Sequence, residues 1–393
     1  MRILHVTREL ASDRRFGMGR SLDPVVAALQ QAGHELRYLT QADLSPRARE
    51  HQRRWTERLL PIARWLFGAA GEAFVLVWIE RLNMGRLAAK VAAGSQADAV
   101  HLHDPWMAWG FRLCRRLHRA GRCRWGLTEH GFGSYSQAIL EEGIPYTRAL
   151  LRLNRWLESS VLRAADWVVC PTRSARAQLA RDMALPEPPA HWHAVPHARP
   201  ELALPSRADA RRQLGWAEGE WHILAMGRLN PVKRFDLCVR ACLQTGRALQ
   251  LTILGEGDAA PLRALLASAP DAPLTLDVRC VTDVAPYLAA ADVYVCSTRN
   301  ESFGLANLEA VAAGLPSICT AAGAVPEVIG ACAWLIPAGD EQVAGAMAQA
   351  LCALMDNPQM TRQMSAVGRR HGAAWPDAKS VALRYEAIYL GLA

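Results

Sequence analysis

The sequence predicts an α/β protein made of two domains, and three observations support this fold class. Short apolar runs typical of buried parallel strands alternate along the chain with helical patterns. Glycine-bearing turns repeatedly lead from a strand into a helix. The length of 393 residues is enough for two α/β domains, and 51% hydrophobic with 21% charged residues describes a folded globular chain.

The first half opens with a strand over residues 1–7 and continues as strand, loop, helix and strand. Gly17 and Gly19 stand at the turn into the helix, where the absence of a side chain permits close approach of the backbone to a ligand. Two later strands end in histidine, at His103 and at His130. Because ligand groups gather at the carboxyl ends of strands in open α/β sheets, both histidines are candidate site residues.

Residues 44–94 mix arginine with tryptophan and phenylalanine, and two interpretations stay open. The longest clean apolar run, Ala73 to Ile79, is too short to span a bilayer. The segment is either a helical insertion that packs inward or a basic amphipathic surface that rests on an anionic membrane. The mixture of basic and aromatic residues favours the membrane-facing interpretation, because both suit the lipid interface.

The net charge of +8 is unevenly distributed. Residues 1–200 carry 29 basic and 18 acidic residues, and the remainder carries 16 basic and 19 acidic residues. The first half therefore suits nucleic acid, an anionic membrane or an anionic substrate. A genome-wide preference for arginine explains the same excess without any function.

The ten cysteines are scattered and form no Cys-x-x-Cys pair. They are expected to be reduced, mostly buried thiols. The first residues form a strand rather than a signal peptide, so we expect a cytoplasmic protein, peripheral on the inner face of the cytoplasmic membrane if the arginine- and tryptophan-rich segment binds lipid.

The second half opens with a strand over residues 221–226, followed by the loop GRLNPVKRFD and a helix. Arg228 and Lys233 lie on this loop between strand and helix. A guanidinium and an ammonium that converge there would neutralise a diphosphate. The next strand–loop–helix unit carries Gly255 and Gly257 at its turn.

The stretch 281–318 contains the most informative pattern in the second half of the chain. Val293–Cys296 is predicted to be a buried strand, and a helix is predicted from Leu305 until Gly314 and Pro316 stop it. The amide groups at the start of that helix are unpaired and suit a phosphate.

The loop that enters this helix contains Glu301, Ser302, Phe303 and Gly304, and Glu309 follows inside the helix. A carboxylate repels phosphate but accepts hydrogen bonds from sugar hydroxyls. A diphosphate flanked by two sugars would use both features.

The motif from Glu301 to Glu309, written ESFGLANLE and followed by AVAAGLP, resembles the hallmark of retaining GT-B glycosyltransferases of the GT4 type. The loop from Arg228 to Lys233 matches the family pattern G-R-x-x-x-x-K. The resemblance covers the whole chain, strongly over residues 221–330 and more weakly over 1–200.

The resemblance implies a role for each matching residue. Arg228 and Lys233 would hold the phosphates of the leaving nucleotide, Glu301 the donor sugar and Glu309 the ribose. His130 matches a family histidine that contacts the donor sugar from the other domain, so catalysis would need domain closure. The remaining implied substrate contacts are Gly17, Gly19, Gly255, Gly257, Val281, Asp283, Ser302, Phe303, Gly304 and Leu305.

Two sites in the sequence depart from the family pattern, and one further site resembles it. Phe16 replaces the first glycine of the family's G-G-x-G-R turn, and Pro196-His197-Ala198 stands where the family shows P-N-G. Pro337 and Asp340 resemble the family's P-x-x-D.

The resemblance also implies the fold: two Rossmann-like domains that face each other across a cleft. Residues 1–200 with 376–393 would form an acceptor-binding domain, and 201–375 would bind the nucleotide sugar. The implied activity is hexosyl transfer, with retention, from a nucleotide-diphosphate sugar to a glycan or lipid-linked acceptor in bacterial polysaccharide or lipopolysaccharide biosynthesis. No Asp-x-Asp pair occurs, so we expect no metal and no cofactor.

Three alternatives belong to other classes. A nucleotide-sugar epimerase shares this fold and would form its product without an acceptor. A glucan phosphorylase also shares it, but no lysine-bearing segment argues for pyridoxal phosphate. A basic nucleic-acid-binding protein would need an exposed arginine stripe with interleaved aromatics. The arginines recur instead inside amphipathic helical patterns, which favours the enzyme and no nucleic-acid partner.

Overall fold

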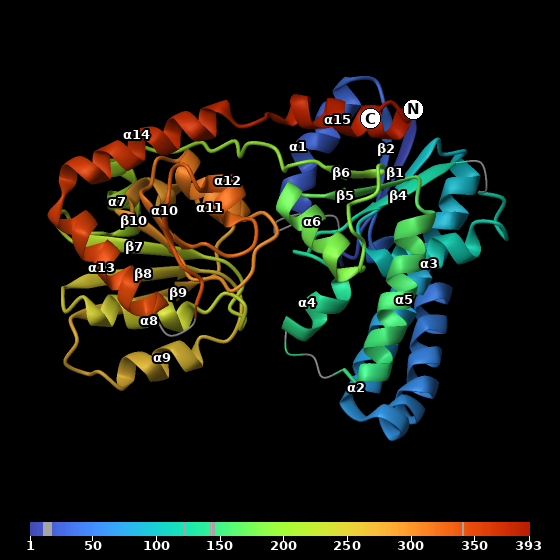
Figure 1. Cartoon of the computed structure of the whole chain (residues 1–393), viewed down its shortest axis with the longest axis horizontal. Coiled ribbons are helices and arrows are strands. Elements are labelled where there is room, and N and C mark those ends of the chain that lie inside the picture. The colour runs from blue at the N-terminus through green and yellow to red at the C-terminus, as the bar shows by residue number, and fades with distance from the viewer. Residues whose placement is uncertain (11–17, 121–122, 142, 144–145, 340–341) are drawn as a thin grey trace. The chain divides into compact units, whose positions relative to one another are not determined.

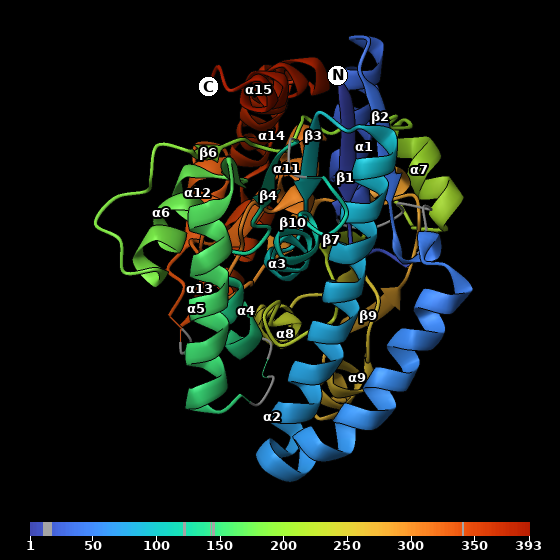
Figure 2. The same cartoon turned by 90° about the vertical axis from the view of Figure 1, so that its right-hand side faces the viewer.

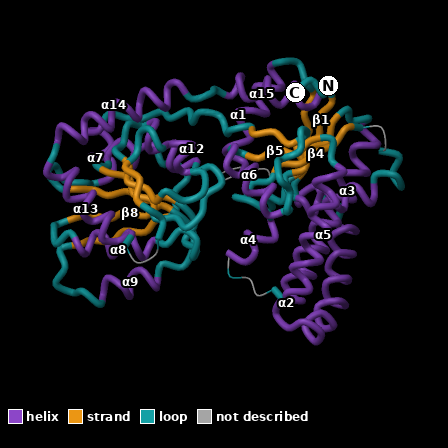
Figure 3. Tube along the Cα trace, in the orientation of Figure 1, coloured by secondary structure: helices purple, strands orange, loops and turns teal. Residues whose placement is uncertain are grey.

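The computed structural model describes residues 1–393 except 11–17, 121–122, 142, 144–145 and 340–341. The chain divides into two compact units, residues 1–198 with 377–393 and residues 199–376. In each unit the described strands form one parallel six-stranded sheet with helices packed against it (Figure 3). The α/β fold class predicted from the sequence is therefore confirmed.

The first unit has the strand order β2-β1-β3-β4-β5-β6. Strand order reverses between β1 and β3, which is where doubly wound sheets bind ligands at the carboxyl ends of their strands. The elements are β1 (Arg2–Val6), α1 (Met18–Gln31), β2 (Glu35–Leu39), α2 (Pro46–Ser95), β3 (Ala99–Leu102), α3 (Pro105–Cys114), β4 (Arg124–Thr128), α4 (Tyr135–Glu141), α5 (Arg148–Ala164), β5 (Trp167–Cys170), α6 (Arg173–Asp182), β6 (Trp192–Ala194) and α15 (Ala378–Leu390).

Alternation of side chains along the strands divides the core of the first unit into two layers. Leu4 and Val6 of β1 pack with α2, α3, α5 and α6. Ile3, on the opposite face of β1, packs with α1 and α15. The C-terminal helix α15 thus completes the core of the first unit, beside α1 (Figure 1).

The second unit has the strand order β12-β11-β10-β7-β8-β9, with its reversal between β7 and β10. Helices α8, α9 and α13 pack on one face, and α11 lies on the other. The elements are α7 (Arg207–Leu214), β7 (Trp221–Met226), α8 (Phe235–Gln244), β8 (Leu249–Leu254), α9 (Ala260–Ala267), β9 (Leu274–Arg279), α10 (Ala285–Ala290), β10 (Val293–Cys296), α11 (Leu305–Ala312), β11 (Ser317–Thr320), α12 (Val325–Ile329), β12 (Trp334–Ile336), α13 (Val343–Asp356) and α14 (Pro358–Ala374).

Helix α2 folds back on itself at Gly68, whose φ of 60° and ψ of −146° are not helical. Its two arms run side by side (Figure 2). The Asn83 side chain donates to Gln52 Oε1 at 2.9 Å and to the carbonyl of Ala48, and a Cβ at Gly71 would clash with the carbonyl of Ala63. The arms are therefore in close contact along the hairpin.

The second arm of α2 packs on α3 and buries Trp78, Met84 and Ala88. The residues near the turn are exposed instead, with Trp65 at 83% and Ile62 and Leu66 at 54% each. One arm thus packs inward, as the first interpretation predicted, whereas the apolar turn faces solvent.

By length and composition, α2 is the one helix of the described residues that is apolar enough to cross a membrane. Its most apolar window of 18 residues has a mean hydropathy of 1.5 and is 17% buried. The expectation from the sequence, which counted only the run Ala73–Ile79, missed this longer window. The reversal at Gly68 divides the helix into two arms.

Candidate functional site

The site in the second unit forms where two loops leave adjacent strands at the reversal of strand order. Lys233 lies on the loop after β7 and Glu301 on the loop after β10. Their side chains are in contact, with Lys233 Nζ 2.5 Å from Glu301 Oε2, and they are 22% and 16% exposed. Two residues that are 68 positions apart, and that the sequence singled out separately, thus form one ion pair.

The electrostatics of Lys233 keep it charged. Burial by itself would lower the pKa of Lys233, but the neighbouring Glu301 carboxylate outweighs it, so the pKa is raised above its usual value. The positive charge of the nearby Arg228 acts in the opposite direction and lowers the pKa of Lys233. Arg228 itself is exposed and has no ion-pair partner among the described residues. The loop after β7 thus carries Lys233, which is in an ion pair, and Arg228, which has no ion-pair partner among the described residues.

Three buried polar residues hold the two loops together. The Arg234 guanidinium donates to the carbonyls of Ser297 and Thr298, at 2.9 and 3.4 Å. The Ser297 hydroxyl is 2.9 Å from the carbonyl of Lys233 and 2.7 Å from that of Arg234. Arg234 has a φ of 48°, and its side chain is aimed at the neighbouring loop while Lys233 points to Glu301. Apart from the position of Arg234 next to Lys233, no pattern in the sequence signals these contacts.

Helix α11 begins at a glycine. Gly304 occupies the N-cap with a φ of 83°, and no side chain caps the helix. The first amide groups of α11 therefore lack a partner within the helix and carry partial positive charge. A Cβ at Gly304 would lie 2.7 Å from Asn307 Nδ2, a buried donor without a hydrogen-bond partner among the described residues.

Other predicted residues on these elements have distinct positions. Phe303 is buried against Trp375 and acts in packing. Ser302 and Leu305 are half-buried, and Glu309 is 7% exposed on α11. The helix start and the two glutamates therefore lie on one continuous segment, as the sequence predicted.

The loops after β8 and β9 contribute in different ways. Gly257 pairs with Leu229, and the amide of Leu229 donates to the carbonyl of Glu256. This contact joins the glycine turn to the loop that carries Arg228. Asp283 is exposed and accepts from the amide of Ala285 at the start of α10, while Val281 is half-buried.

Gly255→Ala is expected to destabilise the second unit by about 1–3 kcal/mol, because a Cβ would lie 1.8 Å from the carbonyl oxygen of Gly227. Thermal unfolding measures the loss. Gly345→Ala is the matched control, since its Cβ would meet only Gln244 Oε1 at 3.6 Å. Equal melting temperatures of the two variants would contradict the close approach of these loops.

In the first unit, His130 follows β4, the neighbour of β3, and therefore lies at the carboxyl ends of the strands. It is half-buried, and its Nε2 lies 3.0 Å from His103 Nδ1. Burial lowers the pKa of His130 to about 3, with help from His197 and Arg8. His130 is therefore neutral at physiological pH. The structure brings the two predicted histidines of the strand ends together.

The glycine turn of the first unit is described in part. Gly19 is buried in the first turn of α1, whereas Gly17 and Phe16 lie outside the described residues. Asp340 of the second unit also lies outside them. Three buried histidines, His5, His101 and His103, have ligand atoms within 4.8 Å of one another, a spacing that a metal ion could use, although the sequence predicted no metal.

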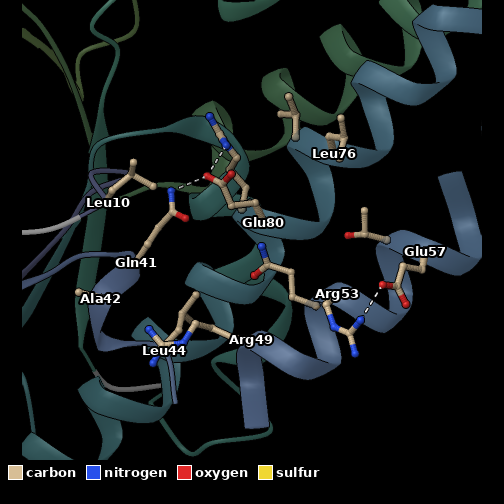
Figure 4. A pocket seen from close by; sticks show the side chains of 13 residues that line it. Leu10, Gln41, Ala42, Leu44, Arg49, Arg53, Glu57, Leu76 and Glu80 are labelled. Carbon is tan, nitrogen blue, oxygen red and sulfur yellow. Dashed lines mark hydrogen bonds and ion pairs between the residues drawn. The ribbon is translucent and has the colours of Figure 1, made fainter. Parts of the chain in front are cut away.

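A cavity of about 680 Å³ lies between the two arms of α2 and the loop after β2 (Figure 4). Arg81, which is buried, pairs there with Glu80 at 2.6 Å and with Asp104 at 3.3 Å. The lining mixes apolar, acidic and basic groups, so it suits a polar ligand of modest size. The lining residues are Leu10, Gln41, Ala42, Leu44, Arg49, Gln52, Arg53, Thr56, Glu57, Leu76, Val77, Glu80 and Arg81.

Two family models match the chain. Residues 220–357 match the model described as Glycosyl transferases group 1, and residues 17–198 match Glycosyltransferase Family 4. A D-inositol 3-phosphate glycosyltransferase from Pseudarthrobacter chlorophenolicus is 29% identical over 315 residues, which is 73% of this chain and 69% of that protein. Other relatives with that name are matched over 46% to 63% of their own length.

Solved structures share the fold of the whole chain. Sucrose-phosphate synthase from Thermosynechococcus elongatus has a TM-score of 0.74 at 20% identity, covering 100% of this chain and 99% of that one. HepE from Anabaena, solved in complex with UDP-glucose, has a TM-score of 0.72 at 13% identity and covers 100% of both chains.

Proposed function

The chain belongs to the GT-B glycosyltransferases of the GT4 type, and on this basis we propose that it transfers a hexose from a nucleotide-diphosphate sugar to a hydroxyl group with retention at the anomeric carbon. One observation carries the proposal: Lys233 and Glu301 meet at the strand-order reversal, next to an exposed Arg228 and an uncapped helix start. Cations suit the diphosphate, and the carboxylate suits the sugar hydroxyls.

In such a transfer, the enzyme must lower the barrier to the departure of the nucleotide diphosphate. Lys233, Arg228 and the amides at the start of α11 would stabilise the negative charge that develops as the bond to the anomeric carbon breaks, each donor contributing about 3 kcal/mol. The acceptor oxygen forms the new bond, and its proton passes to a phosphate oxygen of the departing group. Glu301 would hold the donor sugar, and Glu309 the ribose.

The identity of the donor nucleotide is testable with the intact protein. HepE was solved with UDP-glucose, so UDP leads a calorimetric panel that also contains GDP and ADP. We expect one of the three to bind at micromolar affinity, and a radiolabelled sugar of that nucleotide to be transferred only when an acceptor is present. Product formed without an acceptor would indicate an epimerase, and binding of none of the three would contradict the proposal.

For the acceptor, we infer a glycan or a lipid-linked molecule that is reached at the inner face of the cytoplasmic membrane. The exposed turn of the α2 hairpin supports this inference, because tryptophan and leucine near arginine suit a lipid interface. The names of the relatives suggest a rival, inositol phosphate, which a soluble assay distinguishes. In this proposal the first unit binds the acceptor and the second unit binds the nucleotide sugar.

Replacing Trp65 and Phe67 together with serine is expected to weaken binding to vesicles of phosphatidylglycerol and phosphatidylcholine by about tenfold or more, because 83% and 43% of these residues are exposed at the hairpin turn. Cosedimentation measures the change. Leu117→Ser is the control, an exposed apolar residue beyond α3. Equal sedimentation of all three proteins would exclude the hairpin as the membrane contact.

A further inference from the structure

Helix α5 has one buried face and one exposed face. On the buried face, Leu157 packs with Trp78 of α2 and Trp106 of α3, and Val161 belongs to the core of the first unit. The opposite face is exposed over the first half of the helix, at Arg148, Ala149, Arg152, Leu153, Arg155 and Trp156. These six residues form the α5 face.

The α5 face consists of two adjacent rows at helical spacing. The first row is basic and contains residues spaced i, i+4 and i+7, namely Arg148, Arg152 and Arg155. The second row is apolar, has the same spacing and is shifted by one residue, with Ala149, Leu153 and Trp156. Trp156 is 63% exposed and Leu153 41%. A large aromatic side chain thus stands in solvent directly beside a line of guanidinium groups.

The charge of the basic row is not balanced within the helix. The only acidic residue of α5, Glu158, is fully buried and accepts a hydrogen bond from the Ser136 hydroxyl at 2.7 Å. The three arginines of the row have no ion-pair partner among the described residues. On the first arm of α2, by contrast, Arg53 and Arg54 both pair with Glu50. Like charges at i and i+4 weaken a helix, so helix stability gives no reason for the basic row.

The α5 face lies on the same unit as the exposed turn of the α2 hairpin. Helix α5 and the hairpin extend from the sheet in the same direction (Figures 1 and 2). Asn154 Oδ1 accepts from Trp78 Nε1 of the second arm at 3.3 Å, and the ring of Tyr146, just before α5, lies 6.4 Å from that of Phe74. The first residues of α5 are therefore close to the turn that exposes Trp65.

We propose that the α5 face docks on a bilayer that contains anionic phospholipids, with its arginines at the lipid phosphates and with Trp156 and Leu153 among the headgroups. Guanidinium groups bind phosphate through two hydrogen bonds, and tryptophan is typical of the membrane interface. The inference rests on the membrane-side acceptor of the proposed function and deepens it, because it names the lipid charge that would bring the enzyme to that acceptor. Single-stranded nucleic acid is bound by stacking aromatic side chains, so an apolar row with leucine and alanine favours lipid.

Cosedimentation of the intact protein with vesicles tests the docking surface without donor or acceptor. The wild type should bind vesicles of phosphatidylglycerol and phosphatidylcholine about tenfold or more tightly than phosphatidylcholine alone, and salt should weaken this binding. Replacing Arg148, Arg152 and Arg155 together with glutamine should lower the partition coefficient on the anionic vesicles by about 100-fold, which is about fivefold for each arginine. Trp156→Ser should lower it by about tenfold at low and at high salt, because burial of apolar surface is not screened.

Two further variants separate the α5 face from net charge and from misfolding. Lysine at the same three positions keeps the charge and should bind within about fivefold of the wild type. Glutamine at Arg240, Arg263 and Arg362 removes the same charge from exposed positions of the second unit and should change binding by less than about threefold. Thermal unfolding of each variant reports whether it is folded.

Four results would overturn the proposal. The two glutamine variants could lose binding equally, or the lysine variant could bind as weakly as the glutamine variant of the α5 face. The wild type could bind equally to vesicles with and without phosphatidylglycerol, or the α5 variant could lose binding to a single-stranded oligonucleotide while it keeps binding to vesicles. Absence of transfer in the donor assay leaves the vesicle result unchanged, so the docking surface and the proposed reaction fail separately.

Discussion

Lys233→Ala is expected to lower kcat/KM for the nucleotide-sugar donor by about 100- to 1,000-fold, the loss typical when one donor to a developing negative charge is removed. The ammonium of Lys233 is charged and lies on the loop at the strand-order reversal, 2.5 Å from Glu301. Its removal would take the cation from the departing diphosphate and leave the Glu301 carboxylate without its ion pair. UDP, or whichever nucleotide binds, should therefore bind more weakly to this variant.

The chain offers a matched control for this substitution. Lys379 is one of only three lysines, and it is exposed at the start of α15. Lys379→Ala should leave both kcat and nucleotide affinity unchanged. Turnover of Lys233→Ala within threefold of this control, with both proteins folded, would show that Lys233 does not act on the donor.

Glu301→Gln is expected to reduce turnover by about 100-fold while leaving nucleotide diphosphate affinity unchanged or higher. The amide keeps the volume of the side chain but loses the negative charge that accepts hydrogen bonds from sugar hydroxyls. The same loss removes a carboxylate that repels the diphosphate. Turnover and calorimetry on one preparation thus separate sugar binding at Glu301 from phosphate binding at Lys233.

Glu218→Gln serves as the control for this variant, because Glu218 is an exposed glutamate of the second unit that precedes β7. It should match the wild type in both measurements. A Glu301→Gln variant that lost nucleotide affinity as strongly as Lys233→Ala would place Glu301 at the phosphates instead of the sugar.

The sequence predicted the second unit in detail because its signals are local. The strand Val293–Cys296, the loop and the helix from Leu305 follow one another along the chain, and the periodicity and the glycines define each of them. The cation pair on the loop after β7 is equally local. The loops after β7 and β10 come into contact because both leave parallel strands at the same edge of the sheet.

Contacts between distant segments could not be predicted in the same way. The bonds from Arg234 to Ser297 and Thr298 depend on β7 lying next to β10, and strand order is not encoded in the pattern of a single strand. The contacts of His5 and His101 with the Tyr389 hydroxyl likewise depend on β1 pairing with β3 and on the return of α15.

The hairpin in α2 was missed for another reason. Helix-forming residues surround Gly68, so the pattern on both sides is helical, and one glycine inside a helical pattern does not signal a reversal. The close approach of Gly71 to Ala63, which lets the arms pack, is visible only once they are antiparallel.

The central claim concerns the place of the donor's two phosphates, and a crystal structure of the protein with a bound nucleoside diphosphate tests it most directly. We predict phosphate oxygens within hydrogen-bond distance of Lys233 Nζ and the Arg228 guanidinium, beside the amides of Gly304 and Leu305 at the start of α11. A diphosphate bound at any other strand end, or one that left the Lys233–Glu301 pair intact and out of reach, would contradict the claim.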